Sequence, residues 1–448
     1  EYIISNILNR NPFTIIGILD LETNIKYGFN KKHIPYYVFK PSDSRYPSFY
    51  VASKCSKRTK VYALIKFSHW NTDNKYPYGN CMDIIGEVGV IENEYQNILH
   101  LYSLQYPNLN HKYKHINFEI SSNERLDLRD YNIMSIDPPR CKDIDDAFHL
   151  KKLSNNNYQI GIHIADVSHF IHPNTELDNV IKTRLTSVYA PHKTINMLPN
   201  IYSDDVCSLL PEQDRYAFSL IIECSDSGNI ISYSFHKTII HSKKALSYME
   251  ADHLIDNYDE TLCQMLHLTK NIHSRHKFTI NDINNNSSNY LIQVLMILAN
   301  KIAAETVYKQ FPDCCLLRTH TNQNTYESNN SSLDKYLYYK NMNSATYDIS
   351  PNITSHDTLN IELYTHFTSP IRRYADIIVH RLLTLCMLNE ENIFKQSEVK
   401  YITDEINLRN KTVRKAELKL NKLKIIDSLS DNNFTTNAFI TEYNSDKK

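Results

Sequence analysis

The chain has 448 residues, of which 42% are hydrophobic and 22% are charged, and its formal net charge is −1. This length exceeds one compact core, so we expect two or three domains with the composition of a soluble globular protein. A net charge near zero argues against a uniformly basic surface for nucleic acid, although it allows a local basic groove. Nine cysteines without a C-x-x-C pair favour reduced thiols in an intracellular protein, of cytoplasm or nucleus, over a zinc site or a disulfide framework. The first residue is Glu1 rather than Met, so we expect the natural N-terminus to lie upstream.

The first hundred residues are predicted to form a small β-barrel. Short strand-like runs, separated by Pro, Asn, Asp and Ser, occur at 13–19, 36–39, 60–66 and 98–104. Short strands at this spacing are typical of one small barrel. A polar stretch at 108–122 then predicts a linker.

The following residues, to about 426, are predicted to form a larger body of strands and helices. We expect strands at 131–136, 147–153 and 158–165, the last two forming a hairpin around Asn155-Asn156-Asn157. We expect helices at 289–310, 370–388 and 397–426, and polar residues within 291–307 predict a buried helix there rather than a membrane span. Apolar residues recur at helical spacing in the last helix and should face the core: Ile406, Val413, Ala416, Leu420 and Leu423. The basic residues beside them suit a solvated face and an RNA path equally.

The most informative segment joins the first two of these strands and reads Ser135-Ile136-Asp137-Pro138-Pro139-Arg140-Cys141-Lys142-Asp143-Ile144-Asp145-Asp146. Its two prolines keep it out of regular helix or sheet. A loop can bring such carboxylates together, and they would raise each other's pKa unless a cation is present. Mg²⁺ takes oxygen ligands of this kind, so the pattern favours a metal site.

Three other interpretations of this segment stay open. A solvated acidic loop is common, but it rarely lies between apolar strands. A calcium loop would have Gly at its sixth position and Glu at its twelfth, where counting from Asp137 gives Lys142 and Phe148. A phosphate-transfer aspartate would not need four carboxylates.

A second segment opens a predicted helix and reads Tyr364-Thr365-His366-Phe367-Thr368-Ser369-Pro370-Ile371-Arg372-Arg373-Tyr374-Ala375-Asp376. We expect Ser369 as the N-cap and Pro370 as the first helical residue, which places Arg372 and Arg373 in the first turn. Two cations are unfavourable there unless an anion such as phosphate binds. The spacing is equally compatible with an ion pair between Arg372 and Asp376. Together, the aspartate loop and the arginines predict a phosphodiester hydrolase.

At these residues the sequence closely resembles the ribonuclease II (RNB) family of exoribonucleases, and most of all the eukaryotic branch with the exosome catalytic subunit. The matching segments follow in order along the chain, at 137–147, 163–171, 186–189, 197–199, 207–209 and 365–374. Segments 40–47, 76–79 and 85–89 resemble the second cold-shock-type OB domain of that branch. The resemblance implies an α+β chain with a cold-shock/OB-like RNA-binding domain at 1–107 and an RNB catalytic domain at 108–428. Residues 429–448 resemble the beginning of a truncated C-terminal OB-type RNA-binding domain.

The resemblance implies a processive, hydrolytic 3′→5′ exoribonuclease that uses two metal ions, Mg²⁺ or alternatively Mn²⁺, and releases nucleoside 5′-monophosphates. It implies single-stranded RNA as substrate, an exosome core as partner, a monomeric catalytic unit and no membrane. By position, Arg372 takes the place of the arginine at the scissile phosphate, and Asp145 that of a catalytic residue. The implied metal ligands are Asp137, Asp143, Asp145 and Asp146, and the implied RNA contacts are Tyr189, Tyr248, Arg372 and Arg373.

The sequence departs from the family pattern at three places, of which one is the poorly matched, Asn-rich stretch 319–347. Gln293-Val294 stands where the family usually has a Glu-Glu pair, and Arg140 replaces a small residue in the acidic loop. Glu417 resembles a family glutamate near the active site. Two rival functions are an inactive family member that binds RNA as a regulator, against which the intact acidic loop argues, and a metal-dependent endonuclease. An end-blocked RNA would distinguish the endonuclease.

Overall fold

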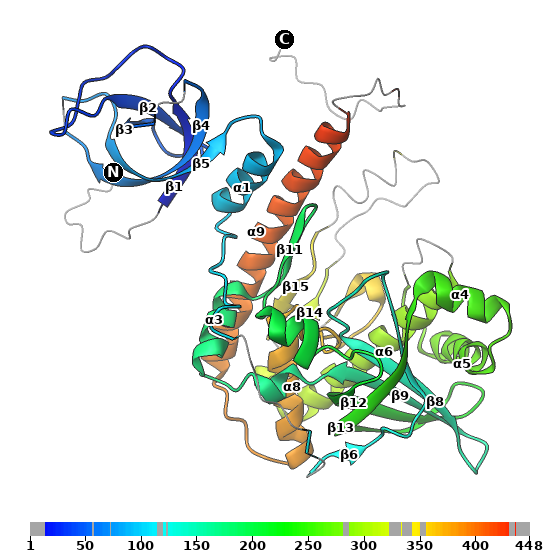
Figure 1. The fold of residues 1–448 in the computed structure, drawn as a ribbon. Helices are drawn as coiled ribbons and strands as arrows, with labels where there is room; N and C mark the ends of the chain where they lie inside the picture. Colours follow the sequence, from blue (N-terminus) through cyan, green and yellow to red (C-terminus); the bar gives the residue numbers. More distant parts are fainter. Residues whose placement is uncertain are drawn as a thin grey trace. The chain divides into compact units, whose positions relative to one another are not determined.

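The computed structural model describes residues 14–55, 58–71, 73–113, 120–121, 124–280, 286–321, 333, 343–349, 355–429 and 435. The chain divides into two compact units (Figure 1). Residues 1–107, 188–194 and 411–437 form the first unit, and residues 108–187, 195–410 and 438–448 form the second. Most of the segment expected to begin a C-terminal OB domain lies outside the described residues.

The first unit contains a closed barrel of five strands, as the sequence predicts. Its strands follow one another around the barrel in the order β1 (Thr14–Asp20), β2 (Tyr36–Pro41), β3 (Phe49–Ala52), β5 (Tyr78–Glu87) and β4 (Lys60–His69). Alternate side chains point inward, and the fully buried ones are Leu19, Phe39, Val51, Val61, Ala63 and Ile65.

Helix α1 (Ile91–Leu101) corrects the strand that we predicted at 98–104. Tyr95 and Leu99 are buried one helical turn apart, so the apolar residues follow a helical spacing that begins upstream of the predicted strand. Glu92 and Glu94 lie in the first turn, where the helix dipole favours negative charge.

The second unit is built on a sheet in the order β12 (Asp214–Cys224), β9 (Tyr158–Ala165), β8 (Asp146–Lys152), β7 (Ile133–Asp137), β13 (Ile230–Ser247) and β6 (Leu126–Asp127). The predicted hairpin is confirmed, because β8 and β9 pair antiparallel. Strand β7 pairs antiparallel with β8 and parallel with β13, with Ser247 opposite Asp137. The acidic segment is therefore the connection between two central strands.

Helices α4 (Tyr248–Asp256), α5 (Glu260–His276), α6 (Ser287–Gln310) and α8 (Tyr374–Leu388) share one apolar core with this sheet. Figure 1 shows α4, α5 and α6 grouped beside the strands. Helix α6 is long and apolar enough to cross a membrane by composition alone, but most of its residues are buried, as predicted for a core helix.

Helix α9 (Gln396–Leu429) confirms the last predicted helix and passes from the second unit into the first. Of its predicted inward stripe, Ile406, Val413, Ala416 and Leu420 are buried, whereas Leu423 is half-buried. The shorter elements are α2 (Val167–Phe170), α3 (Glu176–Arg184), β10 (Val188–Ala190), β11 (Lys193–Ile195), β14 (Leu317–Thr319) and β15 (Thr346–Asp348), a π-helical turn (Tyr202–Val206), and 3₁₀ turns (Pro312–Cys314, Asp357–Leu359). The predicted class, an α+β chain with an N-terminal barrel before a larger α/β body, is confirmed.

Candidate active site

The four predicted aspartates lie on or at the ends of the loop that connects β7 to β8. Asp137 is the last residue of β7 and Asp146 is the first residue of β8, with Asp143 and Asp145 between them. Asp145 is 5% exposed and the other three are half-buried. Two neighbouring strands thus hold both ends of the segment in place, as expected for a loop that presents carboxylates where two paired strands end.

Ser208 holds the middle of this loop. Its hydroxyl accepts the N–H of Ile144 at 3.0 Å and donates to the carbonyl of Lys142 at 2.7 Å. The N–H of Leu209 donates to the carbonyl of Ile144 at 3.0 Å. Ser208 is fully buried, so it supplies backbone partners that the loop cannot find within itself.

Burial, and in part the neighbouring carboxylates, shift the pKa values in this loop. Burial raises the pKa of Asp145 to about 7 and that of Asp137 to about 6, and Asp143 contributes to the second shift. Burial raises the pKa of Asp146 well above its usual range, with further contributions from Asp137 and Asp145. Negative charge in this loop is therefore costly without a cation to offset it.

These residues fit a hard divalent cation. The buried Oδ2 of Asp137 has no hydrogen-bond partner among the described residues, so it is an acceptor that the protein leaves unsatisfied. Carboxylate oxygens are the ligands that Mg²⁺ and Mn²⁺ prefer. In the described part of the chain, however, no group of three or more Asp, Glu, His or Cys side chains is already arranged around a common point. The residue types of the loop therefore fit a divalent cation, but the described side chains are not already arranged as a closed set of metal ligands.

The arginine segment corrects the predicted helix start. Helix α8 begins at Tyr374 rather than at Pro370, and Arg373 has an extended backbone (φ −137°, ψ 125°). The N–H groups of Arg372 and Arg373 both donate to the carbonyl of Ser369, which closes a turn before the helix. Both arginines therefore precede the first helical turn, and Ser369 is not the N-cap.

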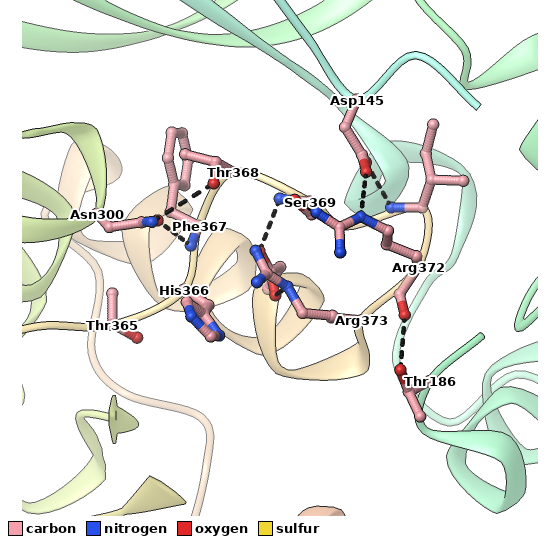
Figure 2. A network of polar contacts seen from close by, with 12 residues as sticks. Asp145, Thr186, Asn300, Thr365, His366, Phe367, Thr368, Ser369, Arg372 and Arg373 are labelled. Carbon is pink, nitrogen blue, oxygen red and sulfur yellow. Dashed lines mark hydrogen bonds and ion pairs between the residues drawn. The ribbon is translucent and has the colours of Figure 1, made fainter. Parts of the chain in front are cut away.

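Asp145 connects the acidic loop to this turn (Figure 2). Its Oδ1 accepts the N–H of Ile371 at 2.9 Å, and its Oδ2 lies 3.3 Å from Nε of Arg372. The Arg372 side chain is 41% exposed, whereas that of Asp145 is 6% exposed. An accessible guanidinium thus lies directly beside the buried carboxylates, where it can meet an anionic substrate.

Arg373, not Arg372, makes the ion pair with Asp376. Nε of Arg373 lies 2.9 Å from Oδ2 of Asp376, which is fully buried. Burial acts to lower the pKa of Arg373, but Asp376, together with Tyr347 and Asp145, raises the pKa above its ordinary value. The alternative pairing of Arg372 with Asp376 is therefore wrong, and the two adjacent arginines face different surroundings.

Three positioning contacts were not identified from the sequence. Thr186 Oγ1 donates to the carbonyl of Arg372 at 3.1 Å (Figure 2). The N–H of Ser187 donates to the same carbonyl at 3.1 Å. Asn300 on α6 bonds the segment just before Ser369. Nothing in the sequence around Thr186 and Ser187 indicates this contact. Asn300 could have been noticed, because it is a polar residue inside the apolar run 291–307.

The structure brings Tyr248 to the acidic loop. It is the first residue of α4 and follows Ser247, which pairs with Asp137 across the sheet. Burial raises its pKa to about 12, with contributions from the carboxylates of Asp146 and Asp137, so the hydroxyl is neutral beside the cluster.

Tyr189 belongs to the other compact unit, on β10. It is 45% exposed, and its backbone N–H donates to Oε1 of Glu417 at 3.1 Å. Burial raises the pKa of Glu417. Tyr189 and Glu417 thus form a contact of their own within the first unit.

Comparison with known proteins adds to this geometry. The profile of the RNB domain matches residues 125–389, and that of the Dis3-like cold-shock domain 2 (CSD2) matches residues 36–103. The exosome complex exonuclease RRP44 homolog A of Arabidopsis thaliana is 32% identical over 432 residues, covering 79% of this chain and 46% of that protein. The chain spans about half the length of the curated relatives it matches.

Solved structures share the fold. Mycoplasma genitalium RNase R in complex with ribose-methylated single-stranded RNA aligns with a TM-score of 0.77 at 20% identity, covering 95% of this chain and 78% of that one. Yeast Ssd1, a pseudonuclease, aligns with a TM-score of 0.73 at 20% identity, covering 95% of this chain and 61% of that one. At this identity both similarities concern the fold alone, and they include one protein described as inactive.

Proposed function

Because the chain belongs to the RNB family, we propose that it is a processive, hydrolytic 3′→5′ exoribonuclease that degrades single-stranded RNA to nucleoside 5′-monophosphates with two Mg²⁺ ions. The observation that carries the proposal is the contact of Asp145 with both Ile371 and Arg372. It joins the carboxylate loop, through the buried Asp145, to an exposed guanidinium, which is the combination that phosphodiester cleavage needs. Mn²⁺ is the alternative metal.

In this proposal each residue has a separate task. Asp137, Asp143, Asp145 and Asp146 would hold the ions, which when bound would supply an activated water and offset charge on the leaving oxygen. Arg372 donates to the scissile phosphate. Its carbonyl and the neighbouring Ile371 N–H are held by Thr186 and Asp145, so the turn is fixed before substrate arrives.

Two tyrosines are proposed to contact bases. Tyr248 follows Ser247, which pairs with Asp137 across the sheet, so its ring is close enough to the acidic loop to stack on a base near the reacting end. Tyr189 is exposed enough to pack on a terminal base. The name of the RRP44 relative describes that protein as an exonuclease of the exosome complex. For this chain we propose a monomeric catalytic unit that associates with an exosome core.

The test of the function uses a 5′-labelled single-stranded RNA, with and without EDTA, beside a DNA of the same sequence. We expect stepwise shortening of the RNA from its 3′ end, release of 5′-monophosphates, and loss of activity with EDTA that Mg²⁺ restores. The DNA should survive, because an RNA-specific channel contacts the ribose 2′-OH.

Three outcomes would contradict the proposal. Internal cleavage of an RNA with a blocked 3′ end would indicate an endonuclease. RNA binding without any hydrolysis, at all metal concentrations, would indicate an inactive RNA-binding member of the family. Equal degradation of DNA and RNA would exclude recognition of the ribose.

The barrel of the first unit carries an aromatic cluster that supports an RNA-binding role for residues 1–107. The ring of Tyr50 lies 5.2 Å from that of Tyr27, 5.4 Å from that of Tyr76 and 5.6 Å from that of Tyr78. Tyr78 also stacks on His69, with ring centroids 4.7 Å apart. The members are half-buried to exposed, so part of each residue is accessible for contact with bases.

Lysines accompany these rings. Nζ of Lys75 lies 5.3 Å from the ring centre of Tyr76, and Lys26 lies over the exposed ring of Phe29. Aromatic rings with adjacent cations are typical of surfaces that bind single strands with little regard to sequence. We therefore propose that this cluster binds RNA bases upstream of the cleaved end.

Replacing Tyr50 with Ala is expected to weaken binding of long single-stranded RNA by roughly 5- to 100-fold, since base stacking is worth about 1–3 kcal/mol. Affinity is measured by fluorescence anisotropy with EDTA present. Tyr50→Phe keeps the ring and should bind like the parent. Tyr258, 87% exposed on the second unit, provides the control. If Tyr258→Ala weakens binding as much as Tyr50→Ala, the cluster has no special role.

A further inference from the structure

The loop that carries Arg372 takes its shape from buried side chains outside it. Asn300, 3% exposed in the middle of α6, accepts the N–H of Phe367 at 2.7 Å. Its amide donates to the Tyr364 hydroxyl at 3.1 Å. The same amide lies 3.5 Å from Oγ1 of Thr368 (Figure 2). All three partners lie in the loop segment, so Asn300 fixes the chain immediately before Ser369.

Asp376 fixes Ser369 itself. Its Oδ1 accepts the N–H of Ser369 at 2.8 Å and a bond from Nη2 of Arg373 at 2.9 Å. Ser369 is 4% exposed. With the backbone held on both sides, its hydroxyl has a defined place next to the turn.

That hydroxyl contacts the arginine proposed to bind phosphate. Nη2 of Arg372 donates to Oγ of Ser369 at 2.8 Å, while Nε of the same guanidinium faces Asp145 at 3.3 Å. The two contacts hold one edge of the planar group from two directions. Within the described residues Nη1 makes no hydrogen bond, so this nitrogen is left to donate to a ligand.

We infer that Ser369 is a positioning residue for Arg372: its hydroxyl fixes the guanidinium so that Nη1 is directed to the scissile phosphate. The inference rests on the proposed function, since it assigns the orientation of the phosphate-binding arginine. A purely structural role would mean that Ser369 only satisfies its own buried hydroxyl. The two roles differ in what happens when Arg372 is absent.

The experiment is a double-mutant cycle with Ser369→Ala and Arg372→Ala on single-stranded RNA. Ser369→Ala alone should lower kcat by about 10- to 100-fold, because it removes a hydrogen bond to a charged group, and should leave KM nearly unchanged. In the Arg372→Ala background the same change should cost less than about twofold. Ser369→Thr, which keeps the hydroxyl, should recover most of the lost rate.

Thr269 offers a matched control for the loss of a buried hydroxyl. It is fully buried on α5, and its Oγ1 donates to the carbonyl of Leu266 at 2.9 Å, away from the site. Thr269→Val is expected to lower the melting temperature without changing kcat. Equal, additive losses of kcat from Ser369→Ala in both Arg372 backgrounds would overturn the inference.

A second measurement does not need hydrolysis. In nitrogen-15 NMR of arginine side chains, rotation about the Nε–Cζ bond of Arg372 should be slow in the parent and fast in Ser369→Ala. Unchanged rotation in the variant would overturn the positioning role even if the enzyme is active. Slow rotation in a parent that hydrolyses no RNA would instead retain the positioning role and reject the proposed function.

Discussion

Replacing Asp145 with Asn is expected to lower hydrolysis of single-stranded RNA by roughly 10³-fold or more while leaving RNA affinity nearly intact. Asparagine has almost the same size, and its Oδ1 can still accept the Ile371 N–H that Asp145 accepts at 2.9 Å. What it loses is the negative charge that faces Arg372 and the proposed ions. The turn should therefore keep its shape while the chemistry fails.

The measurement compares single-turnover hydrolysis of a 5′-labelled RNA with its binding affinity and with the melting temperature of each variant. Asp313, exposed in a short 3₁₀ turn, provides a matched Asp→Asn control that should behave like the parent. Trimming by Asp145→Asn at near the parental rate would show that this carboxylate is not part of the chemistry. Loss of binding together with activity would point to a structural role for Asp145 instead.

The elements that sequence predicted well are those whose pattern is local. The β8–β9 hairpin has an Asn-rich turn between two apolar runs, and α6 has a long apolar stretch, so short-range spacing determines both. Helix α1 was missed although its spacing is also local, because two patterns overlap there. Tyr95 and Leu99 are buried one helical turn apart, but the apolar residues from Ile98 onward also fit the pattern of a strand.

The candidate site was predicted in its residue types but not in its contacts. The four aspartates lie within ten residues of one another, so their spacing alone predicts that they share one loop. The start of α8 could not be predicted in this way, although Ser369-Pro370 is a good local signal for a helix N-terminus. Contacts with Asp145, 226 residues away, and with Thr186, 186 residues away, hold the turn in a non-helical form. Tertiary hydrogen bonds therefore override a local preference worth only about 1 kcal/mol.

Arg372 and Arg373 are neighbours, but replacing each of them with Ala is expected to impair a different property of the protein. Arg372 is 41% exposed and faces Asp145, which retains the bond from Ile371 if the guanidinium is removed. Its loss should lower kcat by about 10²–10³-fold with little change in KM or melting temperature, because it is proposed to act on charge that grows in the transition state. Arg372→Lys should recover little, since an ammonium cannot reproduce contacts made by the planar fork.

Arg373→Ala should instead destabilise the protein by about 3–5 kcal/mol, since it leaves the fully buried Asp376 carboxylate without its ion-pair partner. The comparison requires kcat, KM and chemical unfolding of both variants under the same conditions. RNA affinity measured below the unfolding transition tests the RNA contact that sequence implied for Arg373. A normal kcat in Arg372→Ala would remove this arginine from the proposed chemistry. A fully stable Arg373→Ala protein that binds RNA weakly would show that Arg373 contacts the substrate, and that Asp376 finds another partner when it is gone.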